Sequence, residues 1–278
     1  MRKVDSMDEV FAAMQKVKSH ASAYCTNFFQ VPKKLQSRIE QGDLFLEESP
    51  GAAFFFSADH DFWRIHFCAA GPDVLKRQFN SLPALKTEPL VIDILEQENQ
   101  TEGILTVIKS IGFRPYARLC RLTRNGSAQP APNSSGESQA VCAAPEDVPN
   151  IFELIDSSFD RYAEQIPKLS DIELAVKNRH ILIVKHDQTV AGLLYFETQG
   201  TASTIRYWLV AQKFRALNYG SMLMRSYLAA HGAIKRFTLW VMADNAAALQ
   251  KYQHYGYTSD KLTDHVLVNE IIRHETSH

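Results

Sequence analysis

Residues Trp208–Met224 read WLVAQKFRALNYGSMLM, and this stretch decides the fold. We expect an apolar strand to end at Val210, a loop containing Lys213 and Arg215 to follow, and a helix to begin near Gly220. A loop that leads into a helix points several backbone N–H groups, and the positive end of the helix dipole, at one place. The stretch therefore indicates an anion site, and a pyrophosphate suits it.

Two residues of the stretch favour close contact between loop and ligand. Gly220 has no side chain, so a ligand can approach its backbone closely. Asn218 takes the left-handed backbone conformation more readily than most residues. Lys213 and Arg215 add positive charge, although solvated loop charges of this kind also occur where no ligand binds.

The sequence around this stretch predicts a mixed α/β domain. A helix is expected from about residue 145, and the capping-box pattern Ser170-Asp-Ile-Glu173 indicates a second one. The remaining expected elements are strands at 181–184 and 190–196, a strand ending at 210, a helix at 219–231, a strand at 237–241, a helix at 245–254 and a strand within 257–271. Their order is ααβββαβαβ.

The N-terminal half predicts a similar order of elements. Its expected helices are 6–17, 32–40, 72–79 and 102–110, and its expected strands are 44–46, 52–56, 62–67 and 90–95. The run Ile108-Lys-Ser-Ile-Gly-Phe113 ends a helix as Tyr252-Gln-His-Tyr-Gly-Tyr257 does in the other half. This faint repeat suggests two copies of one fold, and coincidence is the rival explanation because glycine often follows a helix.

A polar segment separates the two halves. Residues 125–138, NGSAQPAPNSSGES, contain no aromatic or branched aliphatic side chain, so they cannot bury enough surface to order themselves. We expect domains at 1–124 and 139–278, joined by a linker at 125–138.

Composition excludes several classes of protein. The 278 residues include 30 Lys and Arg against 31 Asp and Glu, and this balance argues against a dedicated nucleic-acid binder. No apolar run approaches the roughly 20 residues that span a bilayer, and the N-terminus lacks an apolar signal segment. The four cysteines have no metal-ligand spacing. We expect a cytoplasmic protein with no metal and no membrane or nucleic-acid partner.

Two motifs in this order resemble the GNAT family of N-acetyltransferases. Arg215-Ala-Leu-Asn-Tyr-Gly220 is similar to the family's acyl-CoA-binding pattern, Gln/Arg-x-x-Gly-x-Gly/Ala, with Asn218 in place of the middle glycine. Asn245-Ala-Ala-Ala-Leu-Gln-Lys-Tyr-Gln-His-Tyr-Gly-Tyr257 is similar to Asn-x-x-Ala-x-x-x-Tyr-x-x-x-Gly-Phe. The resemblance covers about residues 140–272. It implies an α/β fold of two GNAT-like domains, each a mixed, mostly antiparallel sheet flanked by helices.

The resemblance also implies that the two halves differ chemically. The C-terminal domain is expected to have a splayed central pair of strands. The N-terminal half has Cys68-Ala-Ala-Gly-Pro72 where the anion loop would stand, and it lacks the Asn/Tyr pair, so it is expected to be a degenerate copy that helps to shape the acceptor cleft.

The implied activity is transfer of an acetyl (acyl) group from acetyl-CoA, as cosubstrate, to a primary amine by direct attack. Leu209 and Val210 would pair with the pantetheine arm, and the backbone N–H near Val210 could polarise the thioester carbonyl. Asn245, in one motif with Ala248, would bind pantetheine or the adjacent backbone, and Tyr252 would protonate the leaving thiolate. The pyrophosphate would be held by backbone N–H groups of Arg215, Ala216, Leu217, Asn218, Tyr219, Gly220 and Ser221.

Each role has a simpler alternative, and some roles stay open. Tyr252 could be a core aromatic residue and Asn245 only a helix cap. No acid lies on the strand 204–210 to serve as general base, so candidates are named by composition alone: Glu197, Asp264 and His265. The acceptor, a small-molecule or protein amine, could be lined by Tyr162 and Gln165, which could equally be exposed loop residues. The sequence does not indicate an oligomeric state.

Three other functions compete with acetyl transfer. A non-catalytic acyl-CoA-binding sensor or interaction module would explain the missing base. A tandem aminoacyl-transferase that uses aminoacyl-tRNA would also pair two such domains, but balanced charge and a largely intact CoA loop argue against it. A dinucleotide-binding Rossmann enzyme needs GxGxxG, which is absent.

Overall fold

The computed structural model describes residues 1–29, 32–82, 88–97, 102–126 and 140–269. The chain divides into two compact units. The first contains Met1–Arg118 together with Leu262–His278, and the second contains Leu119–Lys261. The expected linker lies almost wholly outside the described residues.

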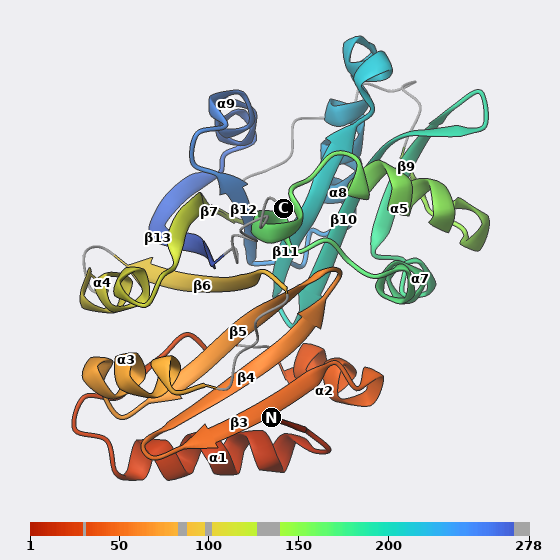
Figure 1. The fold of residues 1–278 in the computed structure, drawn as a ribbon. Coiled ribbons are helices and arrows are strands. Elements are labelled where there is room, and N and C mark those ends of the chain that lie inside the picture. The colour runs from red at the N-terminus through yellow and green to blue at the C-terminus, as the bar shows by residue number, and fades with distance from the viewer. Residues whose placement is uncertain (30–31, 83–87, 98–101, 127–139, 270–278) are drawn as a thin grey trace, which may run out of the picture. The chain divides into compact units, whose positions relative to one another are not determined.

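The first unit is a sheet with helices on both faces (Figure 1). Its helices are α1 (Met7–Ser19), α2 (Pro32–Gln41), α3 (Pro72–Asn80) and α4 (Glu102–Ser110). Its strands follow the order β1 (Arg2–Lys3), β3 (Leu44–Ser49), β4 (Ala52–Asp59), β5 (Phe62–Ala69), β6 (Leu90–Gln97) and β13 (Thr258–Asn269), and β2 (Cys25–Thr26) pairs with β5.

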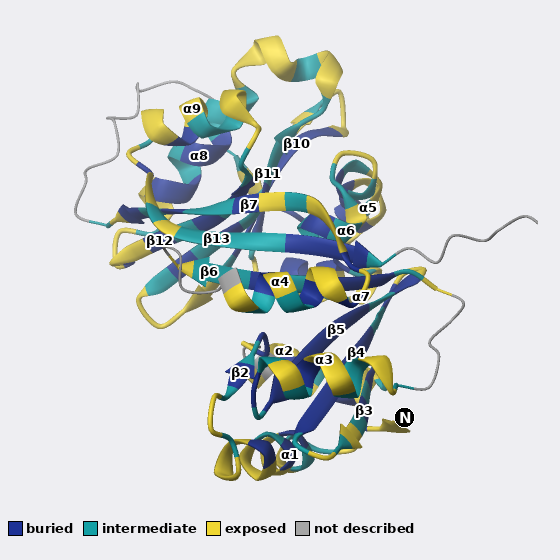
Figure 2. Ribbon diagram, turned by 60° about the vertical axis from the view of Figure 1, so that its left-hand side comes forward, coloured by how far each residue is buried: buried dark blue, intermediate teal, exposed yellow. Residues whose placement is uncertain are grey.

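Alternation along β4 explains why this sheet takes helices on both sides. Phe54 and Phe56 pack with Leu75 of α3 in one apolar cluster. Phe55 points to the opposite face and packs with Val10 of α1 in another cluster. Successive side chains of a strand point to opposite faces, so an uninterrupted apolar run needs cover on both. Figure 2 shows β4 and β5 as the buried strands of this layer.

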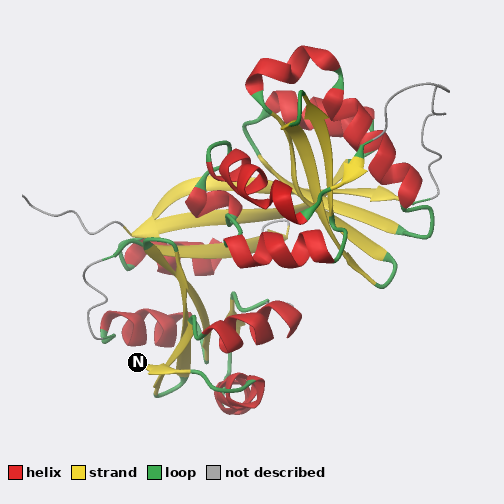
Figure 3. Cartoon of the chain, turned by 90° about the vertical axis from the view of Figure 1, so that its right-hand side faces the viewer, coloured by secondary structure: helices red, strands yellow, loops and turns green. Residues whose placement is uncertain are grey.

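The second unit has the same layered plan (Figure 3). Its helices are α5 (Val148–Asp156), α6 (Arg161–Glu164), α7 (Leu169–Lys177), α8 (Tyr219–Ala230) and α9 (Ala246–His254), with 3₁₀ turns at Pro145–Asp147 and Gln212–Leu217. Its strands follow the order β8 (Val141–Cys142), β9 (Ile181–His186), β10 (Thr189–Gln199), β11 (Ala202–Val210), β12 (Arg236–Met242) and β7 (Arg114–Asn125). Helices α5 and α7 cover one face, and α8 and α9 cover the other.

Each unit takes its last strand from the other half of the sequence. In the first unit, Leu262–Asn269 of β13 pairs with β6. In the second, the residues of β7 from Leu119 onward pair with β12. The two units are therefore not two contiguous halves of the sequence. The last strand of the N-terminal half, β7, pairs in the second unit, and the last strand of the C-terminal half, β13, pairs in the first.

A pair of parallel strands lies inside each sheet. In the first unit, β5 and β6 pair only at Trp63–Ile65. In the second, β11 and β12 pair only at Ala202–Ile205. The other pairings within β8–β12 and β7 are antiparallel. The expected mixed, mostly antiparallel sheet flanked by helices is confirmed.

Most expected helices and strands are present with shifts of a few residues, and α6 and the short strands β1, β2 and β8 were not foreseen. The N-terminal cap of α1 is made as expected, since the backbone N–H of Glu9 donates to Ser6 Oγ at 3.3 Å. Among the described residues, no helix is long and apolar enough to cross a membrane.

Candidate functional site

Strands β11 and β12 separate halfway along β11. Their pairing ends at Ile205, opposite Leu239, while β11 continues to Val210. The edge of β11 that faces β12 is therefore open over the last five residues of the strand, Arg206–Val210. The predicted pantetheine-binding residues, Leu209 and Val210, both lie on this open part.

A bulge in β11 marks the place where the strands part. Phe196 of β10 faces Ile205, but Tyr195 faces Tyr207, so Arg206 has no opposite residue. An extra residue reverses the alternation of side chains beyond it. Ile205 packs toward α8 and α9, yet Tyr207 packs toward α5 and α7. The bulge thereby also turns Trp208 toward α8 and α9.

The loop after β11 ends in an uncapped helix. Asn218 has a φ of +57°, as expected for a residue that replaces glycine there, and α8 begins at the next residue. No described side chain caps α8, so the backbone N–H groups of its first turn, at Tyr219, Gly220 and Ser221, remain available to a ligand. Arg215 donates from Nε to the Val210 carbonyl at 3.5 Å, which holds the loop against the open end of β11.

Trp208 joins the open strand to two helices. Its indole Nε1 donates to the carbonyl of Gly220 in the first turn of α8 at 3.1 Å. Its ring lies 5.4 Å from the ring of Tyr252 and 5.7 Å from that of Tyr255, both of which belong to α9 or its end. The two motifs that the sequence placed about thirty residues apart are thus brought together by a side chain of β11, the strand that precedes both.

Asn245 and Tyr252, the two motif residues of α9, differ in their contacts and burial. Asn245 caps the helix, because its side-chain oxygen accepts from the backbone N–H of Ala248 at 3.0 Å. Tyr252 is buried with 8% of its surface exposed, and no described residue hydrogen-bonds to its hydroxyl. Burial, and next the charge of Glu164, raise the pKa of Tyr252. The hydroxyl therefore keeps its proton at neutral pH.

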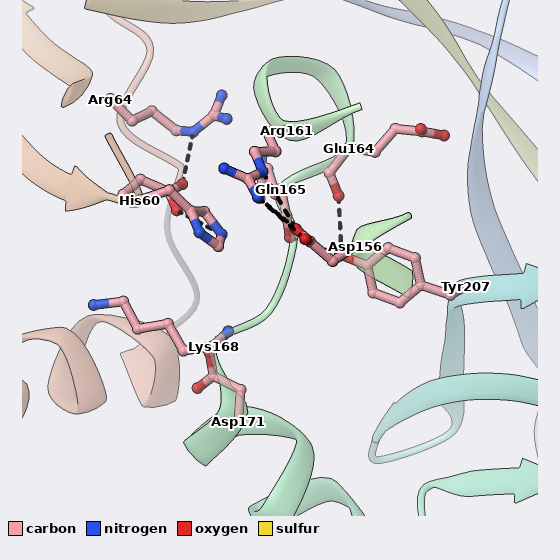
Figure 4. Close-up of polar contacts among 10 residues, drawn as sticks. His60, Arg64, Asp156, Arg161, Glu164, Gln165, Lys168, Asp171 and Tyr207 are labelled. Atoms are coloured by element: carbon pink, nitrogen blue, oxygen red, sulfur yellow. Dashed lines mark hydrogen bonds and ion pairs between the residues drawn. The ribbon is translucent and has the colours of Figure 1, made fainter. Parts of the chain in front are cut away.

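The opposite face of β11 carries a turn at the end of α6. The Tyr207 hydroxyl contacts the carbonyl oxygens of Glu164 at 3.0 Å and Gln165 at 2.7 Å, as Figure 4 shows. Gln165 has a φ of +49° and ends α6. Gln165 and Tyr162 were candidates either to line the acceptor site or to be exposed loop residues, and the structure places the Gln165 backbone against Tyr207 in the open part of β11. Glu164, between them, was overlooked because nothing in its local pattern marks it.

The candidate bases named by composition are divided between the two units. Glu197 lies 3.8 Å from Arg206, in a half-exposed ion pair. Asp264 and His265 belong to the first unit, where His265 contacts Glu96 at 2.6 Å. Burial and the neighbouring Asp93 carboxylate raise the pKa of Asp264 well above its ordinary value. Among the described residues, no group of histidine, cysteine and acidic side chains is arranged to hold a metal ion.

The corresponding gap in the first unit is filled by its own chain. Beyond Ile65, β5 pairs with β2 instead of β6. The side-chain nitrogen of Asn27 donates to the carbonyls of Ile65 and Asp93, each at 3.1 Å, and its oxygen accepts from the Phe67 N–H at 2.6 Å. Segment 25–27 therefore binds the backbone groups of β5 whose counterparts on β11 remain open. Strand β5 also has no bulge against β4.

Comparison with known proteins gives a family and a set of similar folds. Residues 148–257 match the model of the acetyltransferase (GNAT) family. No curated protein matches the chain.

Solved structures resemble nearly the whole chain at low sequence identity. A tandem GNAT protein from the clavulanic acid biosynthesis pathway is 12% identical with a TM-score of 0.66, over 97% of this chain and 98% of that one. A GCN5-related N-acetyltransferase from Sphaerobacter thermophilus is 14% identical with a TM-score of 0.58, over 95% and 91%. One from Kribbella flavida is 14% identical with a TM-score of 0.56, over 87% and 96%. These likenesses concern the fold.

Proposed function

Because residues 148–257 form a domain of the GNAT acetyltransferase family, whose members transfer acyl groups from acyl-CoA, we propose that this chain moves an acetyl group from acetyl-CoA to a primary amine. The observation that carries the proposal is the open edge of β11 over its last five residues, next to the uncapped start of α8. An extended amide-containing arm fits an open strand edge, and a pyrophosphate fits a helix N-terminus.

The binding roles follow from this arrangement. The pantetheine amides would pair with the backbone of Leu209 and Val210, and Arg215 through Ser221 would hold the pyrophosphate with their N–H groups. The side-chain oxygen of Asn245 accepts from the Ala248 N–H, and its amide nitrogen would donate to a pantetheine carbonyl. Ala248 lies half-buried beside it on the same helix.

The reaction proposed is direct attack. The amine nitrogen bonds to the thioester carbonyl carbon, the carbonyl oxygen is polarised by a backbone N–H near Val210, and the C–S bond then breaks. Tyr252 donates a hydrogen bond to the sulfur and supplies the proton that makes the free thiol. The pKa of Tyr252 is raised, whereas an ordinary thiol has a pKa of about 8.5, so complete proton transfer from Tyr252 to the thiolate is uphill. The Tyr252 hydroxyl therefore first stabilises the negative charge that develops on the sulfur by a hydrogen bond, and transfers its proton afterwards.

The test is thiol release from acetyl-CoA with a panel of small amines and amine-bearing peptides, with the acetylated product identified by mass spectrometry. We expect thiol and acetylated amine in equal amounts, and a Tyr252→Phe variant slower by about 10²-fold in kcat. Tyr255→Phe is the matched control, because Tyr255 also packs on Trp208. Tight acetyl-CoA binding without transfer to any amine would support the sensor function instead.

A further inference from the structure

Glu164 occupies the last position of the short helix α6, and its carboxylate is held on one side only. Asp160 caps the helix by accepting from the Ala163 N–H at 2.9 Å. In return, the Asp160 N–H donates to Oε2 of Glu164 at 3.0 Å. No described residue donates to the other oxygen, Oε1. The carboxylate is thus fixed in position with one oxygen free to accept a proton.

Glu164 and Tyr252 lie on opposite faces of the open part of β11. Tyr207 fixes the backbone of Glu164 on the α5–α7 face, while Trp208 packs on Tyr252 on the α8–α9 face. Figure 4 shows the Glu164 side chain carrying its carboxylate away from the Tyr207 contact. Because Tyr207 and Trp208 are adjacent, the acid and the tyrosine flank the same gap. The effect of the Glu164 charge on Tyr252 agrees with this closeness.

We propose that Glu164 is the general base that takes the proton from the acceptor ammonium group. The inference rests on the acetyl transfer proposed above. An amine is protonated at neutral pH and its lone pair is blocked until that proton leaves. The thioester lies in the gap between β11 and β12, so the amine approaches from one face while the sulfur lies toward the other. In this geometry Glu164 is the base on the face from which the amine approaches, and Tyr252 is the proton donor on the face of the sulfur.

The protons balance as follows. The ammonium N–H bond breaks and its proton passes to Oε1 of Glu164. The neutral nitrogen bonds to the carbonyl carbon, and collapse of the tetrahedral intermediate breaks the C–S bond. The thiolate takes a proton from Tyr252, and the second proton lost by the nitrogen restores the tyrosine. The products are an amide and a free thiol, and the proton on Glu164 returns to solvent.

The surroundings of Glu164 favour this role. Burial is the largest cause that raises the pKa of Glu164, and the charge of Asp160 also raises it, while the hydrogen bond from the Asp160 backbone lowers it. The other titratable groups that interact with it are Tyr207 and Tyr252. A carboxylate with a raised pKa is a stronger base once it is ionised.

The Glu164→Gln variant distinguishes a base from a residue that only stabilises α6. Glu164→Gln keeps an oxygen that can accept from the Asp160 N–H, so α6 keeps its cap while the base is lost. We expect kcat at pH 7 to fall about 10²-fold or more, with the Kd for acetyl-CoA and the melting temperature unchanged. Glu153→Gln, an exposed change on α5, is the matched control, and Glu164→Asp should restore part of the activity.

The pH profile separates a base from a positioning residue. Wild-type kcat should level off above the pKa of Glu164, whereas kcat of Glu164→Gln should keep rising tenfold per pH unit toward the pKa of the free amine, about 10. An active wild type with an equally active Glu164→Gln variant of the same pH profile would overturn the inference alone. A wild type that acetylates no amine would overturn the proposed function as well.

Discussion

The indole of Trp208 donates to the carbonyl of Gly220 at 3.1 Å and thereby fixes the first turn of α8 against the open part of β11. The same ring packs on Tyr252 of α9, with the ring centroids 5.4 Å apart. One side chain of the splayed strand therefore sets the relative position of the anion loop and the proposed proton donor.

Trp208→Phe should weaken acetyl-CoA binding while the protein stays folded. Phenylalanine keeps an aromatic ring beside Tyr252 but loses the hydrogen bond to Gly220, which is worth about 1 kcal/mol. We expect the Kd for acetyl-CoA, measured by calorimetry, to rise several-fold. Trp240→Phe on β12 serves as control and should leave the Kd unchanged. Equal affinities for both variants would contradict the positioning role.

Gly192→Ala should disturb the end of β11. A Cβ at residue 192 would lie 2.9 Å from the Leu209 carbonyl oxygen, closer than real Cβ contacts come, and 3.0 Å from Cγ2 of Val210, which is also tight. The end of β11 must shift, at a cost of about 1–3 kcal/mol in unfolding free energy. We expect KM for acetyl-CoA to rise in steady-state assays. Gly232→Ala is the control, since nothing lies within 4 Å of a Cβ there. An unchanged KM would show that these two residues do not bind pantetheine.

One acyl-CoA should bind per chain. The gap of the first unit is filled by segment 25–27, so only the second unit has an open strand edge of this kind among the described residues. Titration calorimetry should give a stoichiometry of one. A stoichiometry of two would mean that the segment yields its place to the ligand.

Asn27→Asp should destabilise the first unit. The aspartate cannot donate to the carbonyls of Ile65 and Asp93 and would bury a charge beside them. We expect a loss of unfolding free energy of about 2–4 kcal/mol, read from urea unfolding. Asn178→Asp, at the end of α7, is the control. If both changes have equal effects, the Asn27 contacts contribute no special stability.

Stability should fall in acid because of His66. Burial, and next the charges of Arg38 and Arg64, lower the pKa of His66 to about 3. A histidine pKa in the unfolded chain is about 6.5, so the unfolded state binds a proton that the folded state refuses. The unfolding free energy should therefore drop as pH falls from 6.5 toward 3, by up to about 1.4 kcal/mol per pH unit.

Urea unfolding of wild type and His66→Gln at pH 7 and pH 5 measures this contribution. The variant should lose about 2 kcal/mol less than wild type between the two pH values. His254→Gln, an exposed change on α9, should behave as wild type does. Identical pH dependence in all three proteins would mean that His66 titrates normally in the fold.

Local patterns predicted the elements well, and long-range pairing escaped them. Apolar spacing located α1 and α8, and the caps at Ser6 and Asn245 located the starts of α1 and α9, because these signals depend on neighbours in sequence. The exchange of β7 and β13 between the units, and the pairing of segment 25–27 with β5, depend on which strand edges pair with each other. The periodicity of the sequence carries no information about that pairing. The anion loop could be predicted because its residues are contiguous in the sequence. Glu164 was missed because its place beside β11 depends on Tyr207, which is 43 residues away.

A crystal structure with acetyl-CoA tests the central claim most directly. We predict one cofactor per chain, with its pantetheine arm paired to Leu209 and Val210, its pyrophosphate at the N–H groups of Tyr219–Ser221, and its sulfur within hydrogen-bond reach of the Tyr252 hydroxyl. A cofactor bound elsewhere, with the open edge of β11 empty, would contradict the account.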